Sequence, residues 1–165
     1  RGLGEEDSYA LLRHEAEVRD LPLLAQASRE SLGRIYQVVG GNPLALKLVV
    51  GQLSVLPLAQ VLDNLRQANS QTIEELYFYI YWQAWDMLSE AAKQTLVALP
   101  LAQEGGFEDV LRESELEAVQ VGQALKELVA LSLVNVGGDL EQPRYYLHRL
   151  TETFLFNEVI KWQGM

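Results

Sequence analysis

The stretch from residue 43 to 53, Pro-Leu-Ala-Leu-Lys-Leu-Val-Val-Gly-Gln-Leu, constrains the fold of this chain more than any other. It carries a single charge, at Lys47, and would be apolar on nearly every side of a helix. A surface helix normally keeps one polar face, so a helix that is apolar all round has to be buried. The stretch therefore predicts the central helix of a bundle and a mainly α-helical fold.

A turn motif, Gly40-Gly41-Asn42-Pro43, directly precedes this helix. The two glycines can adopt positive φ and so end the helix before them with a left-handed cap. Asn42 is a favoured N-cap residue, and Pro43 suits the first helical position, where its missing N–H costs nothing. On local chemistry alone, these residues predict an ordinary tight corner between two helices.

Helical periodicity extends over most of the first 70 residues. We expect helices over 7–18, 28–39, 43–53 and 57–67, with Ser28 capping the second of them. A short polar segment, 68–71, follows. We place a domain boundary there, with a helical bundle in residues 1–70 and a second domain in residues 71–165.

Near the end of the second domain, the hydrophobic pattern changes from helical periodicity to the alternation of β-strands. The elements expected in it are helices over 72–87, 89–100, 108–112 and 115–131, strands over 133–136 and 144–147, and a final helix over 149–162. A capping box (Thr72 with Glu75) opens the first helix, whose many aromatic residues indicate a core or inter-domain contact. Three helices, a two-stranded hairpin around Gly137-Gly138-Asp139 and a closing helix predict a winged-helix domain.

Composition restricts the chemistry. The 165 residues include no cysteine, which removes disulfides and thiolate metal sites and favours a cytoplasmic location. No apolar run reaches the roughly 20 residues that a membrane-spanning helix needs, so we expect no membrane contact. Because the chain begins with Arg1 rather than Met, we expect it to be part of a longer protein.

The net charge of −10 is distributed unevenly. Residues 1–70 hold seven Lys/Arg and eight Asp/Glu, for −1, whereas residues 71–165 hold six and fifteen, for −9. Winged helices commonly bind DNA through their third helix, here 115–131, but its only cation is Lys126. DNA binding needs several cations at phosphates, so we do not expect nucleic acid to be a partner.

Several motifs, in order along the chain, together resemble the STAND ATPases, the superfamily that includes the NB-ARC proteins of plant disease resistance and animal apoptosis. Residues 40–46, Gly-Gly-Asn-Pro-Leu-Ala-Leu, resemble the Gly-x-Pro corner of the family's small helical domain. Residues 124–134, Ala-Leu-Lys-Glu-Leu-Val-Ala-Leu-Ser-Leu-Val, resemble the helix that leads into the family's wing. Residues 146–150, Tyr-Leu-His-Arg-Leu, stand where the family has Met-His-Asp, with Leu147 and Arg149 in place of Met and Asp.

The resemblance implies a regulatory segment that clamps ADP or ATP against an ATPase core preceding it in the same chain. Gly41, Pro43 and Leu44 would lie at the nucleotide, with Pro43 packed on adenine, and His148 would reach the β-phosphate of ADP. Release of this clamp would control switching and self-assembly. The resemblance therefore also implies that the activated protein can form a homo-oligomer.

No phosphate-binding loop of the form Gly-x-x-x-x-Gly-Lys-Ser/Thr is present in this sequence. We therefore expect this segment not to be an enzyme by itself. Two other functions stay open: a winged-helix transcription regulator with a helical dimerisation domain, and a helical protein-interaction adaptor.

Two polar residues, His148 and Lys47, have two interpretations each. His148 lies at a strand-to-helix junction, where backbone N–H groups and the helix dipole favour an anion, but it could instead only terminate the wing. Lys47 could reach a phosphate or extend to the surface. His14 has no second His or Cys nearby and is not expected to bind a metal.

Overall fold

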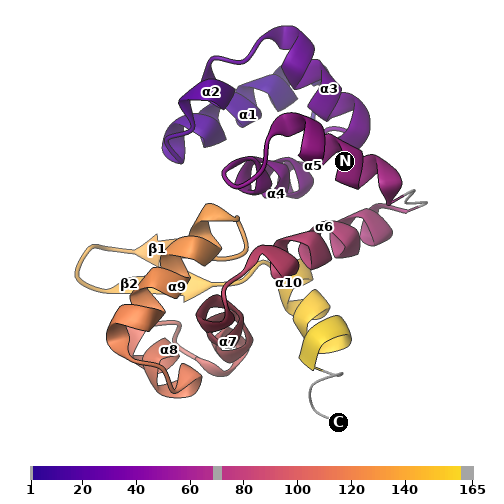
Figure 1. The fold of residues 1–165 in the computed structure, drawn as a ribbon. Coiled ribbons are helices and arrows are strands. Elements are labelled where there is room, and N and C mark those ends of the chain that lie inside the picture. Colours follow the sequence, from indigo (N-terminus) through magenta and orange to yellow (C-terminus); the bar gives the residue numbers. More distant parts are fainter. Residues whose placement is uncertain (1, 69–71, 161–165) are drawn as a thin grey trace. The chain divides into compact units, whose positions relative to one another are not determined.

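The computed structural model describes residues 2–68 and 72–160 (Figure 1). These residues form ten α-helices and one two-stranded antiparallel hairpin, so the predicted mainly α fold is confirmed. The chain divides into two compact units, Arg1–Ile80 and Tyr81–Met165. The division falls within one helix, α6 (Ile73–Met87), and the domain boundary after residue 70 stays a prediction.

The first unit is a helical bundle. Its helices are α1 (Glu5–Val18), α2 (Pro22–Ala25), α3 (Arg29–Val39), α4 (Pro43–Leu53), α5 (Leu58–Gln67) and the first half of α6. Helix α1 packs on α2, α3 and α4, and α5 packs on α3 and α4. The short helix α2 was not expected, because Pro22 reads as a break; it instead occupies the first helical position of α2, where its ring is tolerated.

Helix α4 is the buried centre of this unit. Leu46, Leu48, Val49 and Val50 have no exposed surface, and Gln52 is also buried. The bounds of α4 agree with the expected helix over 43–53. Burying a helix on nearly all sides is what its apolar sequence requires, and this fixes the corner at its N-terminus within the bundle.

The second unit combines helices with the hairpin. After the rest of α6 come α7 (Glu90–Ala98), the 3₁₀ turn η1 (Leu99–Leu101), α8 (Phe107–Ser114), α9 (Ala118–Ala130), β1 (Asn135–Gly138), β2 (Pro143–Tyr146), α10 (Arg149–Phe154) and the π-helical segment η2 (Leu155–Ile160). Helix α7 packs on both α8 and α9, and α8 also contacts β2.

Helix α9 begins three residues later than the sequence pattern indicates. Glu115 has a φ of 60°, in the left-handed region, and this separates α8 from the next helix. The backbone N–H of Glu117 donates to the side chain of Gln120 at 3.1 Å and so sets the new start. Val119 lies in the first turn of this helix, and 71% of its surface is exposed.

The hairpin is antiparallel, with Asn135 opposite Tyr146 and Gly138 opposite Pro143. Its first strand starts two residues later than expected, because Leu133 and Val134 are both buried and cannot alternate as a half-exposed strand would. A third segment joins the hairpin through an isolated bridge between Gly106 and Arg144, and a hydrogen bond of 2.7 Å runs from Tyr145 N to Gly105 O.

Candidate functional site

The corner between α3 and α4 uses its two glycines in different ways. Gly40 has a φ of 79°, as expected, and its N–H donates to the carbonyl of Tyr36 at 2.7 Å to end α3. Gly41 is not among the described residues with positive φ. It is required for a different reason: a Cβ at this position would lie 1.9 Å from the carbonyl oxygen of Leu3.

Asn42 is the predicted N-cap of α4, and this is confirmed. Its Oδ1 accepts from Leu44 N at 3.1 Å and from Ala45 N at 3.3 Å, while its backbone carbonyl accepts from Leu46 N at 3.0 Å. Pro43 has no N–H. The first turn of α4 therefore has no free backbone donor for a phosphate, and the corner presents instead the exposed ring of Pro43 beside the half-buried Leu44.

A third donor reaches the same oxygen of Asn42. The hydroxyl of Tyr77, from α6, donates to Asn42 Oδ1. The side chain of Tyr77 is 4% exposed, and burial raises the pKa of its hydroxyl, which keeps it protonated as a donor. Sequence reasoning missed this residue, because 35 positions separate it from Asn42 and no local signal links the two.

His148 is the N-cap of α10 in the second unit. Its Nδ1 accepts from Leu150 N at 3.1 Å, so in the neutral ring the proton resides on Nε2. The side chain is exposed, and within residues 2–68 and 72–160 no hydrogen bond of Nε2 is found. His148 therefore offers a single directed N–H donor to an external acceptor.

The other half of the expectation for His148, an anion site made of backbone N–H groups, is not supported at this junction. Helix α10 has only six residues, and the N–H of Leu150 is already bound by the imidazole. Any anion at this position would therefore be bound by the side chain of His148 rather than by the backbone. The expected site residues Gly41, Pro43 and Leu44 share one corner of the first unit, whereas His148 belongs to the second.

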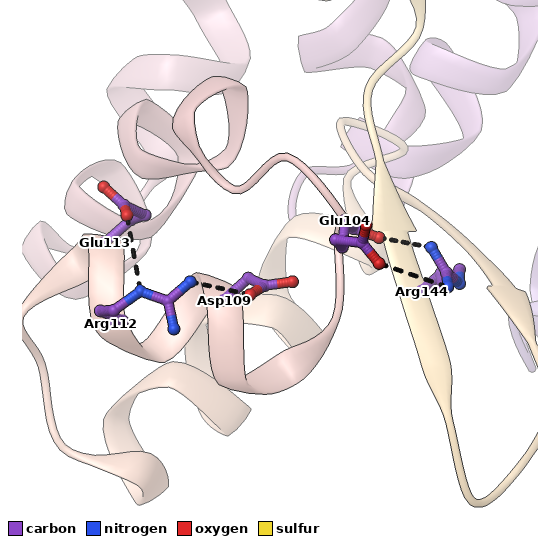
Figure 2. Close-up of polar contacts among 5 residues, drawn as sticks. All are labelled: Glu104, Asp109, Arg112, Glu113 and Arg144. Atoms are coloured by element: carbon purple, nitrogen blue, oxygen red, sulfur yellow. Dashed lines mark hydrogen bonds and ion pairs between the residues drawn. The ribbon is translucent and has the colours of Figure 1, made fainter.

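Two arginines of the second unit, Arg112 and Arg144, lie beside carboxylates (Figure 2). Arg112 lies 2.8 Å from Asp109 and 3.7 Å from Glu113. Arg144 donates to the carbonyl of Glu104 at 2.8 Å, and its guanidinium lies 3.9 Å from the Glu104 carboxylate. Both ion pairs are solvent-exposed and therefore weak, but the acidic neighbours lower the positive potential around each arginine.

The remaining polar residues add no further site. Lys47 is half-buried on α4 and His14 is exposed on α1. In the part of the chain that the structure describes, no group of three or more His, Cys, Asp or Glu side chains is arranged to bind a metal ion. None of the helices formed by residues 2–68 and 72–160 combines the length and the apolar character that crossing a bilayer requires.

Comparison with known proteins identifies no relative: the chain matches neither a model of a protein family nor a curated protein.

Proposed function

We propose that this chain is the regulatory segment of a nucleotide-dependent switch of the STAND type. In this proposal, it closes ADP against an ATPase core that precedes it in the same protein. The chain supplies contacts and no catalysis, while the core supplies the phosphate loop. Exchange of ADP for ATP, or a sensor event, releases the clamp and allows self-assembly.

The observation that carries the proposal is the chemistry of the two surfaces the motifs create. At one, Asn42 satisfies the backbone donors of the α4 N-terminus and leaves an exposed proline ring, which suits a flat apolar base better than a phosphate. At the other, His148 has one nitrogen bound to its own helix and directs the other N–H outward. A donor of this kind suits a phosphate oxygen.

The order of elements in the second unit supports a winged-helix reading. Helix α7 is followed by the Gly105–Gly106 segment that bridges β2, then by α8, α9 and the β1–β2 hairpin. An isolated bridge beside the hairpin, from the segment between α7 and α8, is compatible with a winged-helix arrangement. The acidic neighbours of its arginines argue against DNA binding.

The test measures ADP content and the affinities for ADP and ATP in the full-length protein. We expect His148→Ala to lose about 10- to 100-fold in ADP affinity, the range that one hydrogen bond to a charged group supplies. His148→Asn is the matched control for folding, because asparagine retains an N-cap acceptor for Leu150 N but not the reach of the imidazole. Both variants should therefore lose ADP, and only His148→Ala should also lose the cap.

Pro43→Ala tests the other surface. Adenine is common to both nucleotides, so this variant should weaken ADP and ATP binding by similar factors. An effect on ADP alone would contradict adenine packing at Pro43. Unchanged ADP affinity in both His148 variants would exclude the phosphate contact. A full-length protein that binds no nucleotide would exclude the proposed function and favour the adaptor function instead.

A further inference from the structure

Helix α4 is held at both of its ends by α6. At its N-terminus, the hydroxyl of Tyr77 donates to the capping oxygen of Asn42. Near its C-terminus, Gln52 donates from Nε2 to the carbonyl of Ile80 at 3.2 Å, and both residues are buried. Tyr77 and Ile80 are three positions apart on α6 and so lie on one face of that helix. One face of α6 thus holds α4 at two points, near its N-terminus and near its C-terminus.

The corner is also held by the N-terminal segment of the chain, at Leu3. The N–H of Leu3 donates to the carbonyl of Gly41 at 2.7 Å, and the absence of a Cβ at Gly41 lets the two backbones approach. Pro43 directly follows Gly41 and Asn42, which are tied to two distant segments of the chain. The exposed Pro43 ring is therefore part of a surface whose geometry is set before any ligand arrives.

We propose that Tyr77 is a positioning residue for this corner: by holding Asn42, it keeps the ring of Pro43 in the place where an adenine packs. This inference rests on the proposed function. Tyr77 itself is buried, so in this proposal it acts on the exposed corner through Asn42. Its contribution is pre-organisation, which improves affinity by removing the cost of ordering the site on binding.

The test compares two tyrosine-to-phenylalanine variants of the full-length protein. Tyr77→Phe removes the hydroxyl that holds Asn42, and Tyr9→Phe removes another from the same unit. Tyr9 is a close match, because it is 6% exposed and its hydroxyl donates to a side chain outside the corner, Glu5, at 2.8 Å. We expect Tyr77→Phe to weaken ADP and ATP binding alike by about two- to tenfold, the range of one net hydrogen bond, and Tyr9→Phe to leave both unchanged.

A double-mutant cycle separates positioning from general stability. If Tyr77 acts through Asn42, then adding Tyr77→Phe to Asn42→Ala should cause no further loss of nucleotide affinity. Hydrogen exchange provides a readout without nucleotide. The peptide that contains the amides of Leu44 and Ala45 should exchange faster in Tyr77→Phe than in Tyr9→Phe, because the cap is no longer held in place.

The outcomes distinguish the two proposals. If the full-length protein binds nucleotide and Pro43→Ala weakens it, but Tyr77→Phe behaves like Tyr9→Phe, the positioning role is overturned and the proposed function stands. Unchanged exchange at Leu44 and Ala45 in Tyr77→Phe overturns the positioning role whatever the nucleotide results. If the wild-type protein binds no nucleotide, the proposed function and the nucleotide role of Tyr77 both fail.

Discussion

At the scale of single residues, the two adjacent glycines of the corner show how one residue type serves two physical needs. Gly40 adopts a φ of 79°, which side chains rarely tolerate, and a Cβ there would meet nothing within 4 Å. Gly41 needs no unusual backbone but lies against the backbone of Leu3. The first requirement is conformational and the second is steric, so the two positions should respond differently to substitution.

We expect Gly41→Ala to lower the free energy of unfolding by about 1–3 kcal/mol, the usual cost of forcing an atom into a filled space. The added Cβ has to displace the Leu3 carbonyl and with it the Leu3 N to Gly41 O hydrogen bond. Gly122→Ala is the control, because nothing lies within 4 Å of that position on the exposed side of α9. It should raise stability by about 0.5–1 kcal/mol. Urea unfolding of each variant checks both, and an unchanged midpoint for Gly41→Ala would contradict the close approach.

At the scale of elements, the starts of α3, α4 and α7 are set by local caps and agree with the expected helices over 28–39, 43–53 and 89–100. Ser28, Asn42 and Ser89 each accept from a backbone N–H in the first turn of their helices. The side chain of Ser89 also donates to Glu127 of α9 at 2.9 Å, so this cap ties α7 to its packing partner as well. Helix α7 carries one feature that opposes stability: the hydroxyl of Thr95 is buried and has no partner among the described residues.

Thr95→Val should therefore stabilise the protein. Valine keeps the shape of threonine and removes a hydroxyl that is desolvated without a hydrogen bond, a gain of about 1 kcal/mol in the free energy of unfolding. Thr95→Ser is the matched control, because it keeps the hydroxyl and deletes a methyl group, with an expected loss of about 1 kcal/mol. Thermal melts followed by circular dichroism would measure both. A destabilised Thr95→Val would mean that the hydroxyl has a partner, for example a bound water.

At the scale of the whole molecule, charge is the property that decides between classes of partner. The net charge is −10, of which residues 71–165 contribute −9. The structure adds that Arg112 and Arg144 of the second unit are each held by acidic side chains. A surface of this kind repels polyanions over the whole Debye length, which is about 10 Å at 0.1 M salt.

We expect the chain to pass through a heparin column at low salt and to show no shift with duplex DNA, because it lacks the clustered cations that release counterions. The double variant Arg112→Glu, Arg144→Glu should behave in the same way, since we expect the wild type not to be retained in the first place. Retention of the wild type that both reversals abolish would favour the DNA-binding alternative. Column retention as a function of salt concentration makes the measurement.

What the sequence alone determined are the features that depend on neighbouring residues. Helix α4 and its cap, the caps of α3 and α7, the presence of the hairpin and the exposed proline corner all follow from spacing over a few positions. Such signals act within one or two turns of chain, so they are visible without knowledge of the fold.

Only the tertiary structure decided which distant groups meet. It brought Leu3 onto Gly41 and Tyr77 onto Asn42. It also moved the start of α9 through the backbone of Glu115. The Leu3 and Tyr77 contacts join residues 35 or more positions apart, and a pairing at that range depends on the packing of the bundle rather than on any local pattern.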